Sequence, residues 1–272
     1  MKFTKFLLVG IVFSMFFFGC LQVNTTVNLN QDGTGTIEEI VVMKDEVINM
    51  MKEFAMAFDS TKSEEFNMFN ETDLKAKESE YGKGVKYLSG EKITINGYQG
   101  FKAVYAFEDI NKLTLNPNPD SKVPFGDDLN EPEDKAAQDF LKFDFKKGNP
   151  STLVINFPKP EMEDKIETEE STEFEDSTFS EEEEQKMIEM FDGMKIKVSL
   201  NFNDPIKETD ASFVDGNKIT LMEIDFSEVI KNKEILENLQ KNKPETMEEF
   251  KQVIGDVPGI KVEFKGKVIV KF

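Results

Sequence analysis

Short segments in which apolar and polar residues alternate recur along the chain. Residues 21–30 carry Val, Thr or Leu at every second position, which is the period of a strand with one buried face. The turn sequence Asp32-Gly33-Thr34-Gly35 then leads into a second such segment at 36–43, and together they predict a β-hairpin. Residues 194–202 alternate in the same way. One buried and one solvated face on each strand indicate an antiparallel sheet.

Further turn signals predict more hairpins, because Gly and Asn tolerate the positive φ angles that tight turns require. These turns are Asn96-Gly97 between segments 92–95 and 98–107, Gly148-Asn149-Pro150 within 140–157, Asp215-Gly216-Asn217 within 213–224, and Lys265-Gly266 near the C-terminus. Hairpins are therefore expected in both halves of the chain.

Apolar residues at helical spacing occur in four segments, 45–58, 181–191, 226–239 and 244–254. In the first of these, Val47, Met51, Phe54 and Phe58 recur at intervals of four, three and four residues, which would give a helix one apolar face. Antiparallel hairpins with helices packed on one face of the sheet make an α+β domain, and this is the fold class that the pattern predicts.

The first 20 residues have the layout of a secretory signal peptide. Lys2 and Lys5 precede an uncharged, mostly apolar stretch at 6–18, which is shorter than the roughly 20 residues that a membrane-spanning helix needs. The junction Phe17-Phe18-Gly19-Cys20 resembles the lipobox of bacterial lipoproteins. The resemblance implies that residues 1–19 are removed and that the thiol of Cys20 carries palmitate-type acyl chains.

Several acyl chains would anchor the protein firmly, because each buried methylene contributes about 0.8 kcal/mol. The residue after Cys20 is Leu21 rather than Asp, which in Gram-negative lipoproteins goes with sorting to the outer membrane. We therefore expect a lipid-anchored protein of the cell envelope, facing the periplasm. A Gram-positive membrane lipoprotein remains an alternative. The strand-like segment follows the cysteine directly, so the fold is expected close to the headgroups.

Composition excludes several classes of function. The chain has no His and no Trp, all 33 basic residues are Lys, and there is one Cys. These absences exclude a Ser-His-Asp triad, His-ligated metal, Cys-rich zinc sites and disulfides. A formal net charge of -20 also opposes binding to nucleic acid. Catalysis by Asp, Glu, Lys, Ser or Tyr stays open but has no signature in the sequence, so no catalytic, cofactor-binding or metal-binding residue is singled out.

One segment differs sharply from the rest in charge. Residues 161–186 hold 13 acids and two lysines, too many charges and too few apolar residues to offset the entropy of ordering. The predicted organisation is a signal peptide at 1–19, an α+β region at 20–160, a disordered acidic linker at 161–180 and a second α+β region at 181–272. Whether the two regions share one core stays open. The acidic run is interpreted as solvated rather than as a site for divalent cations.

Three short motifs imitate functional signatures. Ser89-Gly90-Glu91-Lys92 fits the S-x-x-K pattern of penicillin-recognising enzymes, but it opens a predicted strand rather than a helix. Gly33-Thr34-Gly35 lacks the third glycine of a dinucleotide fingerprint and is interpreted as a hairpin turn. The acidic and amide residues at 116–127 only faintly match a calcium loop, because Ser121 replaces its glycine.

The C-terminal third also shows a resemblance. The segments 191–198, 206–211 and 218–221 resemble a pattern of uncharacterised bacterial lipoproteins, and Val257-Pro258-Gly259-Ile260 is similar to the mycobacterial LppM-type lipoproteins. The resemblance implies a β-rich domain after the lipobox. It implies no catalytic residue.

Methionine and phenylalanine gather near the first predicted helix. Met50, Met51, Phe54 and Phe58 could form an adaptable surface for an apolar ligand or a partner, although stripes at helical spacing are more often core. The leading hypothesis is a non-catalytic binding or scaffolding lipoprotein. Its rival is a carrier of a lipid or another apolar small molecule, and a carboxylate-dependent hydrolase is a third possibility.

Overall fold

The computed structural model describes residues 21–49, 52, 69–116, 141–157, 192–232, 251–252, 254–255 and 257–272. The chain divides into two compact units. The larger comprises Leu21–Lys159, Lys195–Ile224 and Lys261–Phe272, and the smaller comprises Met1–Cys20, Pro160–Met194 and Asp225–Ile260.

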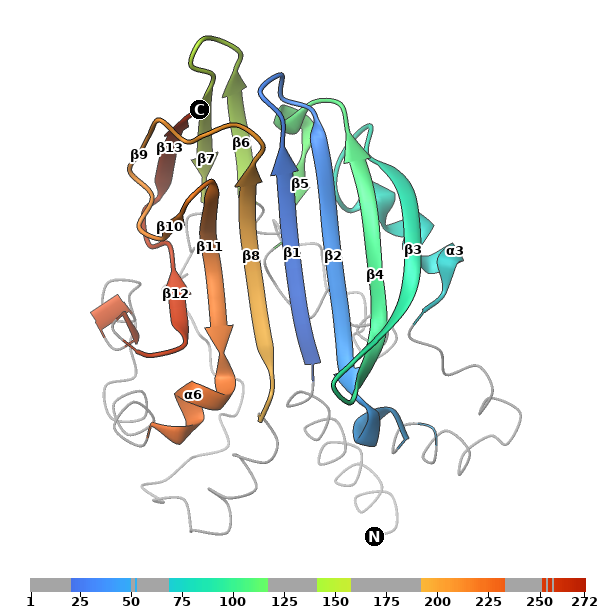
Figure 1. Ribbon diagram of the computed structural model, residues 1–272. Helices are drawn as coiled ribbons and strands as arrows, with labels where there is room; N and C mark the ends of the chain where they lie inside the picture. The colour runs from blue at the N-terminus through green and yellow to red at the C-terminus, as the bar shows by residue number, and fades with distance from the viewer. Residues whose placement is uncertain are drawn as a thin grey trace, which may run out of the picture. The chain divides into compact units, whose positions relative to one another are not determined.

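The strands form two sheets (Figure 1). The larger sheet has the order β10-β11-β8-β1-β2-β4-β3, with β12 paired to β11. Its strands are β1 (Leu21–Leu29), β2 (Gly35–Lys44), β3 (Lys86–Ile95), β4 (Tyr98–Phe107), β8 (Lys195–Phe202), β10 (Val214–Asp215), β11 (Lys218–Asp225) and β12 (Ile260–Val262). The smaller sheet has the order β5-β6-β7-β13-β9. Its strands are β5 (Thr114–Leu115), β6 (Leu141–Lys146), β7 (Thr152–Asn156), β9 (Glu208–Thr209) and β13 (Lys267–Lys271).

Local sequence explains the first hairpin, which confirms the prediction. In β1 every second residue is buried, and the register with β2 runs from Leu21 opposite Met43 to Leu29 opposite Gly35. The carboxylate of Asp32 accepts hydrogen bonds from the backbone N–H and the hydroxyl of Thr34 at 3.0 and 2.7 Å. This turn is therefore stabilised by residues within the hairpin itself.

The hairpin of β3 and β4 is also confirmed. Asn96 and Gly97 have φ angles of 50° and 81°, which is the left-handed backbone that the short turn requires and that Asn-Gly supplies. The backbone N–H of Asp45, directly after β2, donates to the carbonyl of Gly97 at 2.9 Å. The turn is therefore tied to the neighbouring strand.

The core of the larger unit lies between the two sheets. Side chains on the buried face of the larger sheet are almost fully excluded from solvent, among them Val27, Ile37 and Leu200. The rings of Phe202 on β8 and Phe272 after β13 meet with centroids 4.7 Å apart. The predicted hairpin at 140–157 is confirmed as β6 and β7, and it supplies the centre of the smaller sheet.

The predicted α+β class is wrong. The protein is mainly β-sheet, and in the part of the chain that the structure describes a second sheet packs on the dry face of the larger sheet, accompanied by a few short helices. The helices are short: α3 (Glu71–Ala76), η2 (Lys77–Ser79), η3 (Ile110–Lys112) and α6 (Phe226–Lys231), with further helical residues at 45–49, 52, 251–252 and 254. Alternation in a strand shows that one face is buried, but it does not show what buries it.

Two predictions of strand pairing are also wrong. β8 pairs with β1 in parallel, from Gln22 opposite Lys195 to Leu29 opposite Phe202, so the larger sheet is mixed rather than antiparallel. The turn Lys265-Gly266 does not close a hairpin, because β12 pairs with β11 while β13 pairs with β7 and β9. Both errors concern partners that are distant in sequence.

In the smaller unit, α6 begins at Phe226, where a helix was predicted. The carboxylate of Asp225 accepts from the backbone N–H of Ser227 at 3.2 Å, and the hydroxyl of Ser227 accepts from the N–H of Gly193 at 2.7 Å. The helix predicted at 181–191 and the acidic linker lie outside the described residues. No helix that the structure describes is long and apolar enough to cross a membrane.

Candidate functional site

The residues singled out from sequence cannot be placed. Cys20, Met50, Met51, Phe54 and Phe58 all lie outside the described residues, so lipidation and an apolar ligand surface stay predictions. Just before that surface, in the helical residues 45–49, Val47 and Ile48 are buried.

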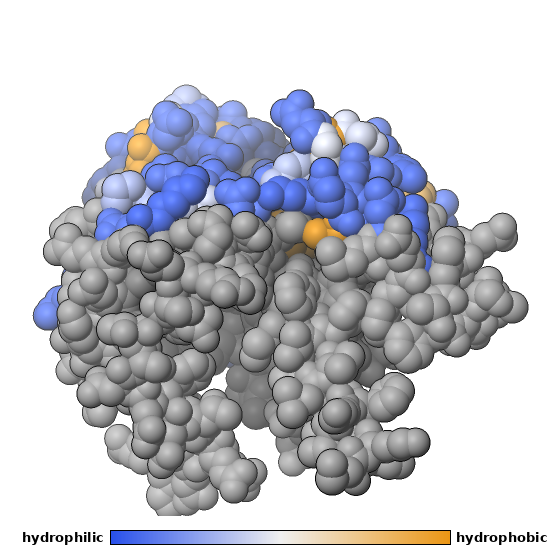
Figure 2. Space-filling view, turned by 90° about the horizontal axis from the view of Figure 1, so that it is seen from below, coloured by the Kyte–Doolittle hydropathy of each residue, from blue (hydrophilic) through white to orange (hydrophobic). Residues whose placement is uncertain are grey.

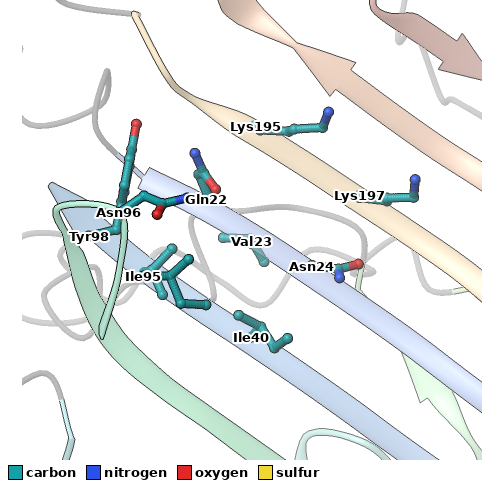
Figure 3. A pocket seen from close by; sticks show the side chains of 10 residues that line it. Gln22, Val23, Asn24, Ile40, Ile95, Asn96, Tyr98, Lys195 and Lys197 are labelled. Atoms are coloured by element: carbon teal, nitrogen blue, oxygen red, sulfur yellow. The ribbon is translucent and has the colours of Figure 1, made fainter. Parts of the chain in front are cut away.

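The structure instead shows a pocket of about 280 Å³ where β1 begins (Figure 3). Its apolar side is formed by Ile40, Val42 and Ile95, and its polar side includes Asn24, Lys195 and Lys197. The turn between β3 and β4 contributes Ile95 and Asn96, and β1 contributes Gln22. Strands that are distant in sequence therefore meet here, and the volume lies near the lower limit for small-molecule sites.

Beside this pocket, three lysines converge on one carboxylate. Glu223 on β11 lies 3.1 Å from the Nζ of Lys195, 2.9 Å from that of Lys197 and 3.4 Å from that of Lys261. Partial burial would raise the pKa of Glu223, but the hydrogen bonds and charges of Lys197 and Lys195 outweigh this and lower it to about 2. The carboxylate is therefore ionised throughout the physiological range, and it orients lysines that carry more positive charge than it neutralises.

Asn24 adds an unsatisfied acceptor to the pocket. Its side-chain oxygen is buried and has no hydrogen-bond partner. A buried acceptor without a donor costs free energy of about 1–3 kcal/mol, so a ligand that donates a hydrogen bond here would recover part of it. The arrangement suits a small group that combines negative charge near the lysines, a donor near Asn24 and apolar contact with Ile40.

A second polar cluster lies on the opposite face of the larger sheet. Glu39 on β2 is completely buried, and the rings of Tyr81 and Tyr105 lie 4.9 Å apart. Burial, and then the charge of Glu39, raises the pKa of both tyrosines well above its ordinary value. The hydroxyl of Tyr105 donates to the carbonyl of Leu74 at 3.0 Å. These contacts tie α3 to the sheet, so the cluster is structural.

The other buried acid of the described residues is equally constrained. Glu263 accepts hydrogen bonds from the backbone N–H and the hydroxyl of Ser212 at 2.7 and 3.0 Å. It therefore holds the loop after β9 to the residues after β12, and this arrangement gives the hydrolase hypothesis no support.

The fold shows where two of the three short motifs that imitate functional signatures lie. Ser89-Gly90-Glu91-Lys92 lies within β3, as a strand rather than a helix start, and Gly33-Thr34-Gly35 ends a hairpin turn and starts β2. The calcium-like segment after Asn116 lies outside the described residues. In the part of the chain that the structure describes, no group of three or more His, Cys, Asp or Glu side chains is placed to hold a metal ion.

Sequence reasoning missed the pocket and its charge cluster. The alternation in β8 did place Lys195 and Lys197 on one polar face. What brings Asn24 beside them is the parallel pairing of β8 with β1, in which Asn24 lies opposite Lys197. That pairing joins strands separated by most of the chain, and no local pattern signals it.

Comparisons with known proteins assign no family. No protein-family model matches the chain, and neither does any curated protein. Among solved structures, the chain is similar to the folded domain of LppM from Mycobacterium tuberculosis, determined by NMR. The TM-score is 0.30 and the identity 11%, over 77% of this chain and 85% of that one. This structural likeness to LppM is distant, and it transfers neither function nor site residues to the chain.

Proposed function

We propose that the protein is a lipid-anchored lipoprotein of the cell envelope, held by acylated Cys20 and facing the periplasm from the outer membrane. Its two-sheet domain acts without catalysis, by binding a partner or a ligand.

The start of the sheet is the observation that carries this proposal. β1 begins at Leu21, and its pairing with β2 already starts at that residue, opposite Met43. Its parallel pairing with β8 starts at Gln22. A chain cleaved before Cys20 would therefore retain every strand that the structure describes, which supports an export role for residues 1–19.

The pocket supports a binding role. It brings lysines, an unsatisfied amide oxygen and apolar side chains together near residue 22. Three of the described acids, Glu39, Glu223 and Glu263, are engaged by tyrosines, by lysines and by Ser212. These contacts support a structural role for the three carboxylates.

The anchor is tested by expressing the full chain and its Cys20→Ser variant in a Gram-negative host supplied with an alkyne analogue of palmitate. The wild-type chain should take up the label, lose residues 1–19 and float with outer-membrane vesicles in a density gradient. The Cys20→Ser variant, which keeps the export signal, should lack the label and leave the membrane fraction if another peptidase cleaves it.

Intact mass distinguishes the outcomes. A wild-type chain that begins at Cys20 and carries diacylglyceryl and acyl groups supports the proposal. An exported but unlabelled wild-type chain of unmodified mass contradicts it, and label with inner-membrane density contradicts only the assignment to the outer membrane.

A further inference from the structure

The pocket beside β1 is bordered by two different kinds of side chain. Asn24 on β1 pairs with Ile40 of β2 on one side and with Lys197 of β8 on the other. Two residues earlier, Gln22 pairs in the same way with an apolar residue and a lysine. Two strand spacings, about 10 Å, separate β2 from β8. The pocket therefore has an apolar end over β2 and a lysine end over β8.

The apolar end is lined by three aliphatic side chains, Ile40, Val42 and Ile95. Val42 is only 4% exposed, whereas Ile40 is partly exposed and Ile95 is 50% exposed. Where Figure 2 shows described residues, seen from below, they are mainly hydrophilic with small hydrophobic spots. Aliphatic side chains that line one pocket and remain accessible to water favour an apolar ligand, because covering them removes apolar area from water.

The lysine end carries more positive than negative charge. One oxygen of Glu223 lies 3.1 Å from the Nζ of Lys195, and the other lies 2.9 and 3.4 Å from the Nζ atoms of Lys197 and Lys261. Three positive charges and one negative charge give these four side chains a formal charge of +2. Each ammonium group has three N–H donors, so the cluster offers more donors than one carboxylate can accept. In Figure 3 the ammonium groups of Lys195 and Lys197 point away from the aliphatic residues.

We propose that this pocket binds a small amphipathic anion, a single unbranched apolar chain of about eight carbons that ends in a carboxylate or a phosphate. The chain lies over Ile40, Val42 and Ile95, and the anionic group accepts hydrogen bonds from Lys195 and Lys197. This inference rests on the binding role proposed above and names the class of ligand for it.

The dimensions of the pocket select a ligand of this size. A chain of about eight carbons, with bonds of about 1.5 Å, spans the distance of about 10 Å between β2 and β8. The volume of about 280 Å³ lies near the lower limit of small-molecule sites, which suits one such chain rather than the two chains of a phospholipid. Glu38, the acid on the polar face of β2, is paired with Lys102 at 2.8 Å, so its charge is already balanced.

Four probes test the two ends of the pocket separately: octanoate, octyl phosphate, octylammonium and butanoate. Each is titrated at neutral pH into the unacylated full chain with Cys20→Ser, and isothermal titration calorimetry measures the affinity. Octanoate or octyl phosphate should bind at least about tenfold more tightly than octylammonium, which keeps the chain and reverses the charge. Octanoate should bind at least about tenfold more tightly than butanoate, which keeps the charge and has a shorter chain.

Two variants place the ligand in the structure. The double variant Lys195→Gln/Lys197→Gln keeps most of each side-chain stem and removes both charges, so octanoate should bind about tenfold more weakly. Lys271→Gln is a matched control, because Lys271 on β13 is also ion-paired, 2.7 Å from Glu208, and is 41% exposed against 39% for Lys195. Its affinity for octanoate should equal that of the unsubstituted protein. Identical circular dichroism of the variants verifies that the fold is retained.

The outcomes separate the ligand from the anchor. Tighter binding of either anion than of octylammonium supports the proposal and identifies the headgroup. Equal affinity for octanoate and octylammonium, or binding of none of the four probes, overturns the ligand class. Equal weakening by the double variant and by Lys271→Gln overturns the assignment to this pocket. None of these results changes the labelling of Cys20, which is measured on the wild-type chain, and an unlabelled Cys20 leaves the binding result standing.

Discussion

Glu38 and Glu39 are consecutive in β2, yet they occupy different environments. Glu39 is completely buried, in the region of Tyr81 and Tyr105. Glu38 is about one-third exposed, and its carboxylate lies 2.8 Å from the Nζ of Lys102 on the neighbouring strand. Because side chains alternate across a strand, one step along the chain moves a carboxylate from the protein interior to its surface. The same charge should therefore affect stability very differently at the two positions.

The same difference in exposure to water distinguishes the dry face of the larger sheet from its polar face. On the dry face, the polar groups around Glu39 are enclosed by aromatic rings and by α3, so they cannot exchange a lost partner for water. On the polar face, Glu223 and its lysines stay partly accessible, with a side-chain exposure of 13% for Glu223 and 24% for Lys197. Lost contacts there can be replaced by solvent, at least in part.

Removing the buried carboxylate should have the largest effect. Glu39→Ala should lower the free energy of unfolding by about 3–4 kcal/mol, because it leaves a cavity and removes the group that the Tyr81 hydroxyl faces. Urea denaturation of the unacylated Cys20→Ser protein, followed by circular dichroism, measures the change. A loss below about 1 kcal/mol would show that the dry face tolerates the change as a surface does.

The contrast between the faces also explains what could be predicted from sequence. Alternation and the Asn96-Gly97 turn depend on neighbours along the chain, and the hairpins they predicted are confirmed. The parallel pairing of β1 with β8 depends on residues far apart, and so does the sheet that covers the dry face. The burial of Glu39 was not predicted, because the sequence around a single Glu does not indicate which distant tyrosines will pack around it.

The candidate site shows the same limit. Its polar members on β1 and β8 each lie in a segment that was correctly predicted as a strand, but the pocket exists only after the strands pair. The composition did exclude chemistry that depends on His and on several Cys, because an exclusion needs only the inventory of residues. The anchor residue Cys20 remains a prediction from the local lipobox pattern.

Acidification should have an intermediate effect, through the polar face. The native pKa of Glu223 is about 2 against an ordinary value of 4.5, so its ionised form stabilises the fold. That contribution is complete above about pH 5 and is lost as the pH falls towards 2, because the unfolded chain then binds the proton more readily. Allowing for the exposure of the lysines, the loss should be about 1–3 kcal/mol.

The Glu223→Gln variant isolates this contribution from that of the other acids. The difference in unfolding free energy between the wild type and this variant, measured by urea denaturation at several pH values, should shrink as the pH falls from 5 towards 2. A difference that stays constant over this range would mean that the lysines do not stabilise the ionised carboxylate, and the charge cluster would lose its role in holding Lys195 and Lys197 at the pocket.

The smallest effect is expected for the ion pair of Glu38 with Lys102. A hydrogen bond to Glu38, followed by its charge, raises the pKa of Lys102, so the pair is favourable in the folded state. Each side chain is nevertheless about one-third exposed, and water can solvate either partner when the other is removed. A double-mutant cycle with Glu38→Ala and Lys102→Ala should therefore give a coupling energy of about 0.5 kcal/mol that decreases further in high salt. A salt-independent coupling of about 3 kcal/mol would place this pair in the same environment as Glu39, and the contrast between the two faces of β2 would fail.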